Sequence, residues 1–238
     1  MTDLTDKIAI VTGASAGIGA AIVKELLASG IKVVGLARRK EKVEELGKGY
    51  ENRLFVLKAD MTNEKDILNA FAWTLENVGP LDILINNAGV LLTNPIENAE
   101  IEEFKSTLDT NLFGAMLCTR EAIRIMKAQD ISGIIININS ITGDAICDLP
   151  LSSIYTASKF GLRGFNGYVR RELALSGSKI RITNLSPGLV GTEMAEAFTK
   201  DSKYIRAEDI AASVKFVVSQ PENVNISQIT VRPVGELL

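Results

Sequence analysis

The stretch KIAIVTGASAGIG, residues 7–19, decides the fold. Its first half, Lys7–Thr12, is a short apolar run rich in β-branched residues, which is typical of a buried strand. Three glycines then lead into a helix predicted over Gly17–Ser29, where apolar residues recur at helical spacing. Glycines allow a sharp turn and a close approach to a phosphate, and the N-terminus of a helix offers free N–H groups to it. The stretch therefore predicts a dinucleotide site, although its spacing is G-x-x-x-G-x-G and a purely structural turn is the alternative.

The rest of the chain alternates between apolar strands and amphipathic helices. Further strands are predicted at residues 32–37, 54–58, 82–86, 133–139, 179–185 and 228–231. Further helices are predicted at residues 40–48, 64–78, 100–129, 152–176 and 207–219, the third with a break near Asn111 and Gly114. Such alternation indicates a parallel sheet with helices on both faces. Because no Pro-, Gly- or Ser-rich linker interrupts the pattern, we expect one domain over residues 1–238.

The composition excludes several classes of function. The 238 residues include 26 Lys and Arg against 29 Asp and Glu, and this small negative charge gives no reason to expect nucleic acid or an anionic membrane as a partner. Histidine is absent, so Ser-His-Asp triads, Cys-His pairs and His-ligated zinc sites are excluded. The two cysteines, Cys118 and Cys147, suggest neither a disulfide framework nor a metal knuckle, and we expect no metal site. No apolar run is long enough to span a bilayer and no secretory signal is recognisable, so we expect a cytoplasmic protein.

The residues after the second strand indicate which dinucleotide is bound. An acidic residue at this place favours the ribose 2′-OH of NAD, whereas an arginine accommodates the 2′-phosphate of NADP. The strand over 32–37 ends without an acid and is followed by Arg38 and Arg39. Arginine pairs with phosphate through two hydrogen bonds and keeps its charge. We therefore expect NADP(H), with a solvated basic loop as the alternative.

Four motifs, in a fixed order along the chain, carry a resemblance to a known family. They are Thr12–Gly19, Asn86–Gly89 (NNAG), Tyr155–Lys159 (YTASK) and Ser186–Gly188 (SPG). Together they resemble the short-chain dehydrogenases/reductases of the compact type, over essentially the whole chain. The resemblance implies a single-domain α/β Rossmann fold, that is, a doubly wound parallel sheet of about seven strands with helices on both faces. It also implies a homodimer or homotetramer that transfers a hydride between a nicotinamide and a carbonyl or alcohol carbon.

Tyr155 and Lys159 make chemical sense as an acid/base pair. Residues four apart share one face of a helix, so the lysine ammonium can lie near the phenol and lower a pKa that is ordinarily about 10. The alternative is a buried tyrosine beside a snorkelling lysine. The resemblance implies two further catalytic residues, of which Ser140 would hold the substrate oxygen and Asn111 would hold a water near the lysine. Asn139 stands before Ser140 where the family usually carries a serine, and a somewhat longer loop than in many relatives leads to Tyr155.

The resemblance implies cofactor contacts from several strand ends. Asp60 would contact the adenine amino group, although an aspartate near the cap of the following helix is the alternative. Lys159 would also contact the nicotinamide ribose. The implied cofactor-binding residues are Gly13, Ser15, Ala16, Gly17, Ile18, Gly19, Arg38, Arg39, Asp60, Met61, Asn87, Ala88, Gly89, Tyr155, Lys159, Pro187, Gly188, Val190 and Thr192.

The predicted substrate pocket is mainly apolar. Its candidate walls are Leu91, Ile146, Cys147, Leu189, Met194 and Phe198. Such walls favour a lipophilic alcohol, aldehyde or ketone. Residues 33–39, 169–173 and 186–193 resemble the farnesol-dehydrogenase-like branch of the family, which implies an isoprenoid alcohol such as farnesol. The alternatives are a reductase of small hydroxy acids or steroids and a catalytically silent NADP(H)-binding regulator; a methyltransferase would not need the tyrosine–lysine pair.

Overall fold

Seven parallel strands form one sheet in the computed structural model, which describes residues 3–147, 149–200 and 202–236. Their order across the sheet is β3-β2-β1-β4-β5-β6-β7, with every neighbouring pair parallel. The strands are β1 (Ile8–Thr12), β2 (Lys32–Ala37), β3 (Leu54–Lys58), β4 (Ile83–Asn86), β5 (Ile134–Ile138), β6 (Arg181–Pro187) and β7 (Gln228–Val231). β1, β4 and β5 are buried along their whole length, because the strands of a parallel sheet are covered on both faces.

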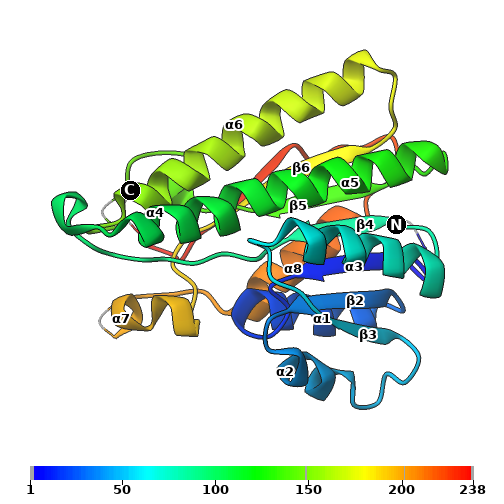
Figure 1. Ribbon diagram of the computed structural model, residues 1–238, viewed down its shortest axis with the longest axis horizontal. Helices are drawn as coiled ribbons and strands as arrows, with labels where there is room; N and C mark the ends of the chain where they lie inside the picture. Colours follow the sequence, from blue (N-terminus) through cyan, green and yellow to red (C-terminus); the bar gives the residue numbers. More distant parts are fainter. Residues whose placement is uncertain (1–2, 148, 201, 237–238) are drawn as a thin grey trace.

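Helices cover both faces of the sheet (Figure 1). They are α1 (Gly17–Ala28), α2 (Lys40–Glu44), α3 (Glu64–Asn77), α4 (Ile101–Leu108), α5 (Gly114–Ala128), α6 (Ser153–Leu175), α7 (Glu196–Thr199) and α8 (Ala207–Val218). One hydrophobic core joins α1 and α8 to Val11, Ile85 and Ile136 of the sheet. A second core joins α3, α5 and α6 to Ile10 and Ile135 on the opposite face. The predicted doubly wound α/β fold with seven strands is therefore confirmed.

The long helix predicted over 100–129 is interrupted near the expected place. After α4 a π-helical turn occupies Asp109–Phe113, and α5 begins at Gly114. Gly114 leaves room for the chain after β3, since a Cβ there would lie 2.5 Å from the Met61 carbonyl oxygen. π-helical turns are frequent at functional sites, and Asn111 lies within this one, almost fully buried.

One predicted helix is shorter than expected, and one short helix was not predicted. The helix predicted over 40–48 is shorter and continues as a 3₁₀ turn, Glu45–Gly47. The sequence pattern does not predict α7 or the 3₁₀ turn Glu193–Ala195 before it, because so few residues show no helical periodicity. Figure 1 shows α7 standing away from the sheet. Within the described ranges, no helix is both long enough and apolar enough to cross a membrane.

Candidate active site

Two adjoining clefts lie at the carboxyl ends of the strands. The first, of about 270 Å³, extends over the ends of β1 to β5 and is called the glycine-loop cleft. It includes the place between β1 and β4 where the strand order reverses, at which open α/β sheets bind nucleotides. The second, of about 770 Å³, lies over the ends of β5 and β6 and is called the β6-side cleft. Both clefts are lined by Ile18, Asn139, Tyr155, Thr192 and Met194.

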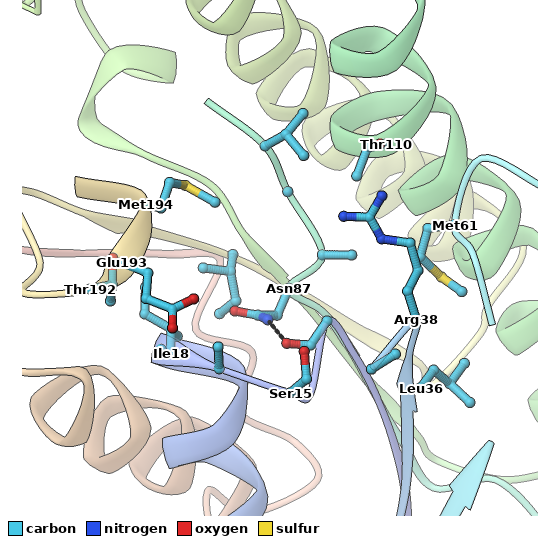
Figure 2. A pocket seen from close by; sticks show the side chains of 18 of the residues that line it. Ser15, Ile18, Leu36, Arg38, Met61, Asn87, Thr110, Thr192, Glu193 and Met194 are labelled. Carbon is cyan, nitrogen blue, oxygen red and sulfur yellow. Dashed lines mark hydrogen bonds between the residues drawn. The ribbon is translucent and has the colours of Figure 1, made fainter. Parts of the chain in front are cut away.

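The glycine turn after β1 leaves no room for side chains. Gly13 and Gly17 have φ angles of +66° and +52°, a conformation that favours glycine. A Cβ at Gly19 would lie 2.5 Å from Asn87 Nδ2 and closer still to the Gly13 carbonyl oxygen. Asn87 Nδ2 donates to the Thr12 and Gly13 carbonyl oxygens at 3.0 and 3.2 Å, which ties the turn to the end of β4 (Figure 2). At Gly13 and Gly17 the turn therefore presents bare main chain to the cleft. Gly19 does not line the cleft, and its lack of a side chain lets it pack against Gly13 and Asn87.

The first turn of α1 adds free N–H groups to the glycine-loop cleft. α1 begins at Gly17, and its N-cap residue, Ala16, makes no side-chain cap. The first N–H groups of a helix lack internal partners and carry partial positive charge. Ser15, Ala16 and Ile18 line the cleft beside them. Because the first turn carries no acidic side chain, this end of α1 can hold a diphosphate.

Two arginines follow β2 on another wall of the same cleft. Figure 2 shows the Arg38 guanidinium directed into the cleft, across from Thr192 and Glu193. The Glu193 carboxylate lies 3.6 Å from Arg39 and 3.9 Å from Lys42, so exposed ion pairs connect the loop after β6 to α2. Arg38 is thus available for an anion at the point where a 2′-phosphate would lie.

Asp60 and Met61 line the cleft after β3. The Asp60 carboxylate accepts hydrogen bonds from the N–H and the hydroxyl of Thr62, at 3.0 and 2.9 Å. Asn63, not Asp60, caps α3, because its side chain accepts two N–H groups of the first turn. Asp60 therefore orders the loop before the cap, and its contact with an adenine stays a prediction.

Ser140, Tyr155 and Lys159 converge where the two clefts meet. Ser140 follows β5, and its Oγ accepts hydrogen bonds from the N–H and the hydroxyl of Thr142, at 3.2 and 3.0 Å. Tyr155 and Lys159 share one face of α6, and the lysine Nζ lies 5.6 Å from the centre of the phenol ring. The same Nζ donates to the Ile138 carbonyl oxygen at 3.0 Å. Both side chains are buried, with 9% of Tyr155 and 4% of Lys159 exposed.

Burial sets the protonation of this pair and corrects the prediction for Tyr155. Loss of hydration raises the pKa of Tyr155 to about 12, although its hydrogen bond with Ser140 acts in the opposite direction. The predicted lowering is wrong for the cofactor-free chain, because burial of the phenol outweighs its hydrogen bond with Ser140. Burial also lowers the pKa of Lys159 to about 8. Near neutral pH the pair therefore consists of a neutral phenol and a mostly protonated ammonium.

Asn111 lies behind the clefts and not on their walls. Its Oδ1 accepts from the Val90 N–H at 2.8 Å, and its Nδ2 donates to the Val90 carbonyl oxygen at 2.9 Å and to Ser158 Oγ at 3.1 Å. Ser158 Oγ in turn donates to the Tyr155 carbonyl oxygen at 2.6 Å. These bonds join the π-helical turn to the loop after β4 and to α6. Asn111 thus helps to position Tyr155, and its predicted water-holding role stays a prediction.

The β6-side cleft has mainly apolar walls. Of the predicted substrate residues it is lined by Leu91, Cys147, Leu189, Met194 and Phe198. Ile146 was also expected there, but it does not line this cleft, because its side chain points to solvent and is 78% exposed while the adjacent Cys147 takes the inward place. Burial raises the pKa of the Cys147 thiol, which leaves it protonated near neutral pH and makes it a wall and not a nucleophile.

Three residues expected at the cofactor lie on this second cleft instead. Pro187, Gly188 and Val190 line the β6-side cleft, whereas Thr192 lines both. The loop after β6 therefore separates the two clefts, with its first residues on the β6-side cleft.

Three buried hydroxyl side chains at the site were not singled out by the sequence. Thr12 Oγ1 accepts from the N–H groups of Asn87 and Ala88, both at 3.0 Å, while Thr142 and Ser158 hold Ser140 and α6 as described. Thr12 and Ser158 lie within two of the motifs and Thr142 follows Ser140, but a hydroxyl at such a place is too common in one sequence to assign it a role. Among the described residues, no group of three or more His, Cys, Asp or Glu side chains could hold a metal ion.

Comparison with known proteins gives relatives along the whole chain. A sequence model described as short chain dehydrogenase matches residues 7–203. The farnesol dehydrogenase of Aedes aegypti is 39% identical over 237 residues, which cover 97% of each chain. The closed form of a serine dehydrogenase complexed with NADP⁺ is similar with a TM-score of 0.88 at 30% identity, covering 97% of this chain and 96% of that one. A metagenomic short-chain oxidoreductase in complex with NADP has a TM-score of 0.84 at 30% identity, covering 98% and 99%.

Proposed function

Because the chain belongs to the short-chain dehydrogenase family, we propose that it is an NADP(H)-dependent oxidoreductase that interconverts a lipophilic alcohol and its aldehyde or ketone. The observation that carries the proposal is the meeting of the two clefts at Tyr155, beside Ser140 and Lys159. A dinucleotide in the glycine-loop cleft and a carbonyl compound in the β6-side cleft would share one buried phenol.

The residues of the glycine-loop cleft fit NADP(H). The bare main chain of the glycine turn and the first turn of α1 would hold the diphosphate. A Cβ at Gly13 or Gly19 would displace this turn, because it would collide with Ala88, Asn87 or the Gly13 carbonyl oxygen. Arg38 would bind the 2′-phosphate, with Asp60 near the adenine and Lys159 near the nicotinamide ribose. Two solved relatives at 30% identity hold NADP, which supports this assignment.

Hydride transfer is the chemistry that the nicotinamide supplies when bound. The chain itself orients the substrate and moves a proton. Ser140 Oγ accepts two hydrogen bonds from Thr142, which leaves its own proton to be donated, to the Tyr155 oxygen in the chain alone and to the substrate oxygen when a substrate is bound. Tyr155, a neutral phenol below its pKa of about 12, would donate its proton to the carbonyl oxygen during reduction. Lys159, protonated below about pH 8, would stabilise the phenolate that forms.

We include an isoprenoid alcohol such as farnesol among the proposed substrates. The apolar walls of the β6-side cleft and the 39% identity to a farnesol dehydrogenase support this choice. A small hydroxy acid is the second candidate, because a serine dehydrogenase is similar in structure and Lys203 lines the same cleft. A lysine could pair with a carboxylate, whereas farnesol carries no negative charge to pair with it.

We also propose a homodimer or homotetramer, located in the cytoplasm. Large apolar side chains on the outer surface of α5 and α6, including Met116, Tyr168 and Leu175, are exposed in the single chain and support an oligomer. Light scattering on the purified protein would count the subunits, and a monomer at micromolar concentration would contradict this part of the proposal.

A spectrophotometric screen tests the reaction. Alcohols with NADP⁺, and aldehydes and ketones with NADPH, would be followed at about 340 nm, where the reduced nicotinamide absorbs. We expect turnover with terpenoid and other apolar compounds and much less with serine or other hydroxy acids. Binding of NADPH without turnover across the panel would favour the silent regulator, and failure to bind NADP(H) would refute the proposal.

A further inference from the structure

A carboxylate from the segment after β7 forms part of the β6-side cleft. Glu236 lines this cleft together with Gly188 and Leu189, the first residues after β6. Its side chain is only 16% exposed. A charge withdrawn from water is costly unless it is paired and hydrogen-bonded, so its partners indicate what it does.

Both carboxylate oxygens of Glu236 are bonded. Oε1 accepts a hydrogen bond from the Leu189 N–H at 2.9 Å, and Oε2 accepts one from Arg232 Nε at 2.9 Å. The carboxylate comes so close to the main chain that a Cβ on Gly188 would collide with it. Beside it, the Gly188 N–H donates to the Val231 carbonyl oxygen at 2.8 Å. The start of the loop after β6 is thus held by one main-chain bond and one charge-assisted bond.

These bonds bear on the substrate because Leu189 begins the wall segment, residues 189–200 and 202–205. The Ile205 N–H donates to the Leu189 carbonyl oxygen at 3.0 Å, which ties the end of the wall segment to its beginning. Met194 and Phe198 lie between these ends and line the β6-side cleft. Among its described residues, the wall segment has one 3₁₀ turn and the four-residue α7, and neither contains a buried residue. The position of the wall therefore depends on how its two ends are held, at Leu189 and at the bridge between Val190 and Ile205.

We propose that Glu236 is a positioning residue for the substrate, which anchors the wall segment at Leu189 and so sets the shape of the β6-side cleft. The inference rests on the proposed function, because it takes this cleft as the substrate site. Glu236 acts through Leu189 and not on the reacting atoms. The turn after β1 and Arg38 come from other strand ends. The wall segment also contributes Thr192, Glu193 and Met194 to the glycine-loop cleft, so we expect loss of the anchor to affect the dinucleotide less than the alcohol.

Three variants test the anchor by steady-state kinetics. Glu236→Ala removes both bonds, Glu236→Gln keeps an oxygen that can accept from the Leu189 N–H, and Glu76→Gln changes an exposed glutamate on α3 as the matched control. In Glu236→Ala we expect the KM for the alcohol to rise about tenfold, the scale of losing a hydrogen bond to a charged group, with kcat and the NADPH Kd each within about twofold of wild type. Glu236→Gln should recover most of the KM, and Glu76→Gln should match wild type.

Amide hydrogen exchange gives a readout that needs no turnover. We expect exchange in a peptide spanning Leu189 to be about tenfold faster in Glu236→Ala than in wild type, with peptides from α1 and β1 unchanged. Unchanged exchange at Leu189 would overturn the anchor, and an equal loss of alcohol and NADPH affinity would show a general structural contact instead. If wild-type protein turns over nothing, the proposed function fails, while the exchange result still decides whether Glu236 anchors the wall segment.

Discussion

Replacing Lys159 with methionine would separate the cost of its buried ammonium from its use. Burial lowers the pKa of Lys159 from 10.5 to about 8. At pH 7 the lysine is protonated in both the folded and the unfolded chain, so the folded state bears the whole cost of desolvation. A pKa difference of about 2.5, at about 1.4 kcal/mol for each pKa unit, makes this cost roughly 3 kcal/mol. The penalty is complete below about pH 8 and fades as the pH rises toward 10.5, because unfolding then takes up a proton.

Methionine has a similar length, no charge and no hydrogen to donate. The variant has no buried ammonium, so the desolvation cost of Lys159 is absent. It also lacks the hydrogen bond of 3.0 Å from Lys159 Nζ to the Ile138 carbonyl oxygen, and leaving that oxygen unpaired costs about 2 kcal/mol. We therefore expect Lys159→Met to be about 1 kcal/mol more stable than wild type at pH 7, about 2 kcal/mol less stable near pH 10.5, and inactive at both.

Urea unfolding followed by circular dichroism, at fixed protein concentration and at both pH values, measures this difference. The change of sign between the two pH values is the diagnostic result. A variant that is less stable than wild type by the same amount at pH 7 and pH 10.5 would refute the reasoning, since it would show that Lys159 is not penalised by burial.

Three further predictions concern the cofactor and the proton. Arg38→Ala should raise the Kd for NADPH about 10- to 100-fold and leave that for NADH within about twofold, because only NADPH carries the 2′-phosphate; equal losses in calorimetric titrations would remove this role. Gly19→Ala should weaken NADPH and NADH alike, by about tenfold or more, since its Cβ displaces the Gly13 turn and Asn87; fluorescence titration showing wild-type affinity would contradict this. The rate of alcohol oxidation should increase as the pH rises from 7 to 9, because Tyr155 with its raised pKa must lose a proton. The rate of carbonyl reduction should fall above about pH 8, because Lys159 becomes neutral there. Identical pH profiles in the two directions would count against the assignment.

The fold could be predicted from the sequence because its strands are continuous apolar runs. Each predicted strand overlaps an observed one to within about two residues at either end, and the break in the long helix falls at the π-helical turn that holds Asn111. α7 was not predicted, because four residues are too few for a periodic pattern. Motif residues such as Tyr155 and Lys159 were brought together because their spacing on one helix already fixes their geometry.

The rest of the site depends on contacts between distant segments. The pKa of Tyr155 follows from burial, which no local pattern reveals, so it moves in the direction opposite to the prediction. Ile146 and Cys147 are adjacent and both apolar, and only the path of the loop decides that Cys147 faces the cleft. Glu236 bonds Leu189 across 47 residues, a contact for which the sequence carries no signal.

Transfer of deuterium tests the central claim most directly. Wild-type protein and Tyr155→Phe would each be incubated with an apolar aldehyde and NADPH that carries deuterium at both C4 positions of the nicotinamide, and the alcohol product would be examined by mass spectrometry. We predict that wild type places one deuterium on the carbinol carbon, and that Tyr155→Phe binds NADPH normally but forms product at least about 100-fold more slowly. Unlabelled product from wild type, or undiminished labelling by Tyr155→Phe, would contradict the account.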